Sequence, residues 1–127
     1  MSNIALIGLG GLVGTLSRYW ISQWLETRAQ SPFPYGTLVV NVLGCFAAGF
    51  LFQALEHAAI SEGVRLAIFV GFLGGFTTFS AYGLQSLVLV RGGMLSLAAV
   101  NVLVSNVAGL AMVWVGAAVS RLVVSSA

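Results

Sequence analysis

The residues best suited to chemistry lie in one short stretch near the middle of a long apolar segment, residues 66–90. Residues 71–82 read Gly71-Phe72-Leu73-Gly74-Gly75-Phe76-Thr77-Thr78-Phe79-Ser80-Ala81-Tyr82. They combine hydroxyl groups with aromatic rings, whose edges carry partial positive charge. Neutral donors and ring edges can replace part of the hydration shell of an anion. The stretch therefore favours contact with a small, dehydrated and weakly held anion.

The same stretch is a poor helix. Glycine costs about 1 kcal/mol against alanine in a helix interior, and adjacent β-branched threonines add to the conflict. At membrane depth, unwound backbone must be buried in protein or line a polar cavity, and such breaks form ion or substrate sites in transporters. We therefore expect the glycines of residues 71–82 to break a helix at an ion or substrate site.

Composition defines the surroundings of this stretch. The chain has 127 residues, of which 59% are hydrophobic and 6% are charged, with a mean hydropathy of +1.04. Soluble domains carry about 25% charged residues, so this is an integral membrane protein surrounded by lipid. A scattered net charge of +2 gives no sign of a nucleic-acid partner. The single Cys45 allows no internal disulfide and is expected to pack between helices.

Four segments are long enough to cross a bilayer, which takes about 20 helical residues. They are residues 3–25, 36–55, 61–90 and 94–119, with Pro32 and Pro34 in the first connection and an expected N-cap at Ser61. Arg18 follows the first apolar stretch rather than leading it, so we expect a retained span and not a cleaved signal peptide. The sequence predicts one all-α domain, residues 1–127, with the third helix broken at mid-membrane.

The arginines leave the orientation in the membrane undecided. Arg65 and Arg121 fall on one side, while Arg28, Arg91 and the nearby Arg18 fall on the other. The positive-inside rule needs an imbalance to orient a protein. Either other factors set the topology weakly, or the chain inserts both ways and assembles as an antiparallel pair.

Small and polar residues form stripes on the other spans. Gly10, Gly14 and Arg18 share a face, and Arg18 either points toward protein or water or extends to the lipid headgroups. The stripe on the second span is Thr37, Asn41, Cys45 and Ala48, and the stripe on the fourth span is Asn101, Ser105, Gly109, Met112 and Gly116. Such stripes serve either helix packing or a polar path. For Asn41 the path is favoured, because its amide lies deep in its span and has donors and an acceptor to satisfy.

The acidic residues exclude several functions. Glu26, Glu56 and Glu62 all fall at span ends, and the single His57 lies outside the spans. Proton-coupled carriers need an intramembrane carboxylate or histidine, and metal or triad catalysis lacks its ligands and bases, so no enzyme is expected. One four-helix bundle fills its own centre with side chains, so an ion path requires a dimer or larger assembly. In an antiparallel pair the two breaks would meet, and their freed carbonyls could share a cation.

Three motifs resemble the Fluc (CrcB) family of fluoride channels. They are Gly10-Gly11-Leu12-Val13-Gly14 with Arg18-Tyr19, then Gly36-Thr37-Leu38-Val39-Val40-Asn41-Val42-Leu43-Gly44, and finally residues 71–80. The resemblance implies a dual-topology antiparallel homodimer with two pores at the subunit interface. It also implies passive, selective export of fluoride through the cell inner membrane, and a structural sodium ion at the dimer centre.

The resemblance further implies roles for individual residues. The sodium ion would be held by the backbone carbonyls of Gly74 and Thr77. The ion pathway would comprise Asn41, Phe79, Tyr82, Thr37, Ser80 and Ser105, with Arg18 in the vestibule.

Two residues depart from the family pattern: Tyr82 stands where phenylalanine is usual, and Ala81 where threonine is common. Tyr82 keeps its ring edges and adds a hydroxyl, whereas Ala81 removes one donor. Both changes predict an altered rate of permeation. The rival functions are a small dimeric secondary transporter for another solute and a non-transporting assembly subunit whose glycine faces serve only packing.

Overall fold

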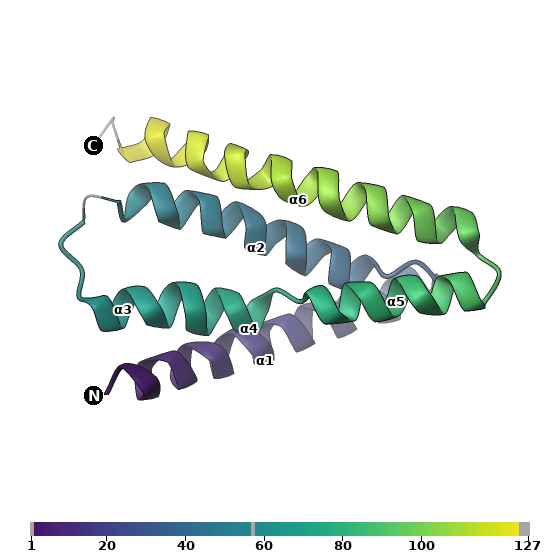
Figure 1. Cartoon of the computed structure of the whole chain (residues 1–127), viewed down its shortest axis with the longest axis horizontal. Coiled ribbons are helices and arrows are strands. Elements are labelled where there is room, and N and C mark those ends of the chain that lie inside the picture. Colours follow the sequence, from purple (N-terminus) through teal and green to yellow (C-terminus); the bar gives the residue numbers. More distant parts are fainter. Residues whose placement is uncertain (1, 57, 125–127) are drawn as a thin grey trace.

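The computed structural model describes residues 2–56 and 58–124, and this part of the chain is helical with short connections (Figure 1). The elements are α1 (Asn3–Ala29), α2 (Tyr35–Ala54), α3 (Glu62–Leu66), the π-helical η1 (Ala67–Leu73), α4 (Gly74–Phe76), α5 (Phe79–Arg91) and α6 (Leu95–Val124). The segments α3, η1, α4 and α5 together form the third helix. Four helices are therefore long and apolar enough to cross a membrane, which confirms the predicted all-α membrane protein.

Helix ends follow local capping chemistry. The hydroxyl of Ser61 accepts a hydrogen bond from the Val64 amide at 3.3 Å, which confirms the predicted N-cap. Arg65 donates from Nη2 to the Leu55 carbonyl at 2.9 Å, so it satisfies a backbone group just after α2. The first and last helices run further than predicted, to Ala29 and Val124. The second was predicted to end in Glu56-His57, and His57 lies outside the described residues.

The helices pack most closely in two pairs, α2 with α6 and α1 with the first part of the third helix (Figure 1). Backbone meets backbone in both pairs. A Cβ on Gly14 would overlap the Phe72 carbonyl, and one on Gly75 would stand 2.6 Å from the Gly11 carbonyl. A Cβ on Gly116 would likewise overlap a carbonyl of α2. The glycines therefore allow the close approach that packs helices in a membrane.

The expectation that glycines break the third helix is wrong. Gly71, Gly74 and Gly75 all lie within helical segments, because two of them are held against the α1 backbone. The helix breaks instead at Thr77 and Thr78, which are extended, with φ/ψ of −87°/155° and −149°/112°. The break itself is thus confirmed within residues 71–82, but tertiary packing decides its position.

The break also separates Phe76 from Phe79 and Tyr82, three aromatic residues that recur at three-residue spacing and would share one side of an unbroken helix. Phe76 lies before it, is buried, and stacks on Phe72 with ring centroids 5.7 Å apart. Phe79 lies after it and is 82% exposed in this single chain. The regular three-residue spacing of the rings therefore does not produce one continuous face.

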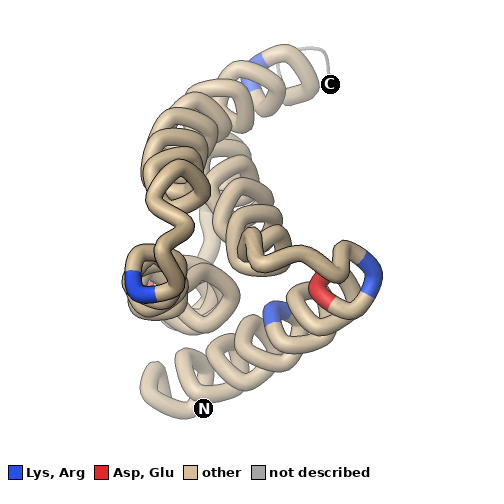
Figure 2. The backbone as a smooth tube through the Cα atoms, turned by 90° about the vertical axis from the view of Figure 1, so that its right-hand side faces the viewer, with Lys and Arg blue, Asp and Glu red and all other residues tan. Residues whose placement is uncertain are grey.

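Outside these contacts the surface is apolar and the charges are few. Trp20, Trp114 and Leu110 are among many large apolar side chains that are exposed around the bundle. Figure 2 views the chain from the end with the α1–α2 and α5–α6 connections, and colours only a few backbone positions as charged. This surface suits lipid contact, and the protein is a multi-pass membrane protein.

Candidate functional site

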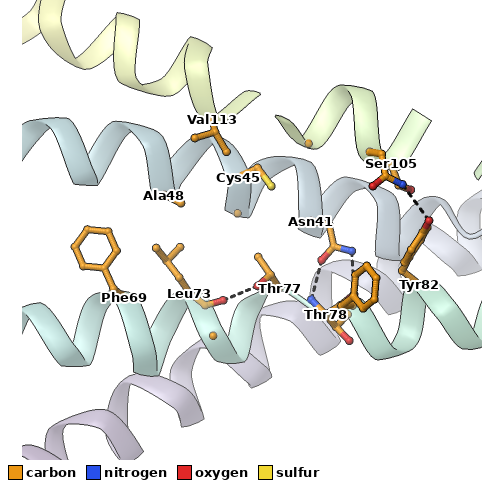
Figure 3. A pocket seen from close by; sticks show the side chains of 15 residues that line it. Asn41, Cys45, Ala48, Phe69, Leu73, Thr77, Thr78, Tyr82, Ser105 and Val113 are labelled. Carbon is orange, nitrogen blue, oxygen red and sulfur yellow. Dashed lines mark hydrogen bonds between the residues drawn. The ribbon is translucent and has the colours of Figure 1, made fainter. Parts of the chain in front are cut away.

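A side chain from α2 holds the break in the third helix. Asn41 donates from Nδ2 to the Thr78 carbonyl at 3.0 Å, and its Oδ1 accepts from the Thr78 amide at 2.7 Å (Figure 3). The carboxamide thus pairs with both backbone groups of one extended residue, as a neighbouring strand would. This arrangement satisfies the polar requirement that the sequence indicated for Asn41, and it stabilises unwound backbone inside a membrane.

The break creates two helix ends that face each other. On the first side, Thr77 donates from both its amide and its hydroxyl to the Leu73 carbonyl, at 3.0 and 2.9 Å. On the second side, the Thr78 hydroxyl caps α5 by accepting from the Ala81 amide at 3.2 Å. A helix C-terminus carries partial negative charge and an N-terminus partial positive charge. A cation is therefore favoured at the first end and an anion at the second.

A groove of about 480 Å³ runs past the break between α2, α6 and the third helix. Among the predicted site residues it is lined by Asn41, Gly74, Thr77, Phe79, Tyr82 and Ser105. Figure 3 shows these elements converging on the groove, with Asn41 and Thr78 on one side of it and Tyr82 reaching toward α6. The fold therefore gathers six predicted residues from four elements around one space.

Two aromatic rings form part of the groove wall. Phe79 and Tyr82 lie with ring centroids 5.3 Å apart and planes tilted by 47°. Both rings line the groove, and an aromatic ring has a positive edge that can attract an anion. The Tyr82 hydroxyl accepts a hydrogen bond from Nδ2 of Asn106 at 3.1 Å. The added hydroxyl is thus fixed by α6 rather than free.

A chain of hydrogen bonds runs behind the groove between α5 and α6. Ser105 donates to Oδ1 of Asn101 at 3.3 Å, Asn101 donates to the Ser86 hydroxyl at 2.9 Å, and Ser86 donates to the Tyr82 carbonyl at 2.8 Å. Asn101 is 1% exposed. Asn101 therefore serves hydrogen bonding between helices. Ser105 takes part in the same series of hydrogen bonds and also lines the groove.

Three predicted site residues lie away from the groove lining. Thr37 is 5% exposed in the first turn of α2. Ser80 is exposed, with its hydroxyl 3.3 Å from that of Thr78. Arg18 donates from Nε to the Gly75 carbonyl at 3.0 Å. This contact decides between the two alternatives for Arg18, because the side chain points toward protein at the level of the break and not to the headgroups.

Several lining residues were not predicted for the site. Asn106, Thr78 and the apolar side chains Phe69, Leu73 and Val113 complete the wall. Val113 lies four residues after Gly109, so helical spacing alone places it on the same stripe. Nothing in the local sequence indicated that Thr78 would offer its backbone to Asn41.

The carbonyls before the break have the properties of a cation site. Those of Gly74 and Thr77 accept no hydrogen bond from the described residues, and both residues line the groove. A Cβ on Gly74 would meet no atom of the described residues within 4 Å, and Gly74 is exposed in the single chain. In transporters, carbonyls of unwound backbone and of half-helix C-terminal ends coordinate sodium. The residues therefore fit the implied ion, although one chain offers few of the oxygens a hard cation takes.

Comparisons with known proteins found a family model and relatives that match most of this chain. The family model described as "CrcB-like protein, Camphor Resistance (CrcB)" matches residues 5–117. A "Fluoride-specific ion channel FluC" from Methylococcus capsulatus is 47% identical over 116 residues, which are 91% of this chain and 51% of that protein. The chain therefore spans about half the length of this relative.

Other relatives match along nearly their whole length. Proteins with the same name from Citrifermentans bemidjiense and Desulforapulum autotrophicum are 43% identical over 122 residues and 44% identical over 118 residues. The matches cover 95% and 92% of this chain, and 98% and 94% of those proteins. On the extent of these matches, the chain belongs to the CrcB-like protein family.

Proposed function

We propose that this protein is a channel that conducts fluoride passively out of the cell. The observation that carries the proposal is the groove beside the break, where the N-terminal end of α5, ring edges and neutral donors line one space. Each favours a small anion without holding it by a full charge. Weak binding at several such groups lets an ion enter and leave. The names of the relatives supply the identity of the anion.

Passive conduction fits the positions of the acids. Glu26 lies in the last turn of α1, Glu56 follows α2, and Glu62 begins α3. A proton-coupled carrier exchanges protons at an acid or histidine within the membrane. Fluoride would therefore move down its own gradient, with Arg18 at the level of the break adding positive potential near the path.

The pathway is proposed to be completed by a second, antiparallel copy. Phe79 is 82% exposed although it lines the groove, so one wall of the path is open in a single chain. The near-equal arginine count at the two ends allows both orientations in the membrane. Two copies related by a two-fold axis would bring two sets of Gly74 and Thr77 carbonyls together. A structural sodium ion bound there would join the subunits, in the cell inner membrane.

Fluoride efflux from liposomes carrying the purified protein tests the proposal. We expect efflux that needs only a fluoride gradient, with potassium and valinomycin to balance charge. Efflux that requires a proton gradient would instead identify a secondary transporter. A protein that forms dimers but carries no fluoride would be an assembly subunit, and the channel proposal would fail.

A further inference from the structure

We propose that Asn106 positions the Tyr82 hydroxyl so that its proton serves as an additional hydrogen-bond donor to the permeating anion. The inference rests on the proposed function and adds a binding group to it. Its basis is a pair of hydrogen bonds at one nitrogen. Nδ2 of Asn106 lies 2.7 Å from the Val102 carbonyl and 3.1 Å from the Tyr82 hydroxyl.

The Val102 contact fixes which atom of the amide is the nitrogen. A backbone carbonyl can only accept, so the side-chain atom 2.7 Å from it must be a donor. One N–H of Asn106 is directed to its own helix, and the other is directed to Tyr82.

The direction of the Tyr82 hydroxyl follows. An amide nitrogen has two protons and no acceptor capacity, so the phenol oxygen must accept from Asn106 and cannot donate to it. The hydroxyl proton of a phenol lies in the ring plane, on the side opposite the accepted bond. No other hydrogen bond in the described part of the chain uses this hydroxyl. Its proton is thus left for a ligand.

The ligand side is the groove. Tyr82, Asn106 and Phe79 all line it, and the Tyr82 ring lies 5.3 Å from that of Phe79. A proton directed there would meet an anion that is already in contact with the ring edges. A small anion of high charge density gains more from such a donor than a large one. Tyr82 is therefore a specificity-determining residue, and Asn106 is its positioning residue.

A comparison of the parent with four variants tests the inference. Fluoride efflux from liposomes is measured over a range of internal fluoride concentrations, which separates the half-saturating concentration from the maximal rate. The test variants are Tyr82→Phe, Asn106→Leu and the double variant. The control is Tyr35→Phe, which makes the same chemical change at a residue outside the groove lining.

Loss of one donor to a charged ligand predicts that Tyr82→Phe raises the half-saturating concentration about ten-fold with little change in maximal rate. Asn106→Leu as a single variant should also raise the half-saturating concentration. In the Tyr82→Phe background the same change should raise it by less than about two-fold, because Asn106 acts only through the hydroxyl. Tyr35→Phe should behave as the parent.

Two results would overturn the inference alone. One is a conducting parent whose half-saturating concentration is unchanged in Tyr82→Phe. The other is an Asn106→Leu effect of equal size in both backgrounds, which indicates a structural role independent of the hydroxyl. A parent that carries no fluoride overturns the proposed function, and this inference with it.

Discussion

Replacing Asn41 by leucine tests whether the carboxamide holds the broken helix. Leucine has nearly the same shape but makes neither of the two hydrogen bonds to Thr78, at 3.0 and 2.7 Å. Thr78 would keep an extended backbone with its amide and carbonyl deprived of their partner. The change therefore removes both hydrogen bonds of this Asn41–Thr78 clamp while keeping the branched shape of the side chain.

The magnitude follows from the number and surroundings of these bonds. Hydrogen bonds between membrane helices contribute about 0.6 kcal/mol on average and up to about 1.7 kcal/mol. A backbone group left unpaired in a dry site costs about 1–3 kcal/mol. Thr78 lines the groove and is half-buried, so water can reach part of it. We expect a loss of about 2 kcal/mol, or about 30-fold in the unfolding equilibrium.

Unfolding by sodium dodecyl sulfate in detergent micelles, followed by circular dichroism at fixed protein concentration, measures this loss. The control is Gln53→Leu on the same helix, whose amide bonds Glu56 and Arg121 at an exposed site. It should cost less than about 0.5 kcal/mol. If Asn41→Leu were as stable as the parent, or if Asn41→Leu and Gln53→Leu lost equal stability, Asn41 would not be holding the broken helix.

Four further outcomes are expected. Phe79→Ile should abolish fluoride efflux while the dimer persists in cross-linking, because the exposed ring adds little to packing within the chain but supplies a ring edge; unchanged flux would exclude that role. Gly14→Ala should destabilise the protein by about 1–3 kcal/mol, since the new Cβ would overlap the Phe72 carbonyl. Gly8→Ala, with no atom within 4 Å, should leave stability equal or up to about 1 kcal/mol higher in the same assay. A reporter fused to the C-terminus should signal from both sides of the membrane, and signal from one side alone would contradict dual topology.

Hydropathy and helix propensity account for what the sequence predicts correctly. Apolar length gives four spans, because each must cover the hydrocarbon thickness. The conflict between glycines, threonines and helical backbone locates a break within residues 71–82. The stripe of Asn41, Cys45 and Ala48 predicts a shared face on α2, and these residues do line the groove.

The exact place of the break depends on distant residues and is therefore absent from local sequence. Gly71 and Gly75 remain helical because the α1 backbone lies against them. Thr78 is extended because Asn41, far upstream in the chain, pairs with it. Thr37 belongs to the same stripe as Asn41 but does not line the groove. At this end of α2 the backbone lies against α1, where a Cβ on Gly36 would stand 2.7 Å from the Ser22 carbonyl. Tertiary contacts thus override propensity and periodicity at each of these positions.

A single break can serve ions of both signs because its two ends have opposite polarity. The segment before Thr77 ends in free carbonyls, which suit a cation, and α5 after it begins with amides, which suit an anion. Arg18 donates a hydrogen bond to the carbonyl of Gly75 in α4. That oxygen is therefore occupied, and one chain has fewer carbonyls left for a cation. The remaining carbonyls of Gly74 and Thr77 are then too few for a hard cation without a second copy. Under the proposed function, the same backbone geometry would therefore serve both the anion path and the pairing of two copies.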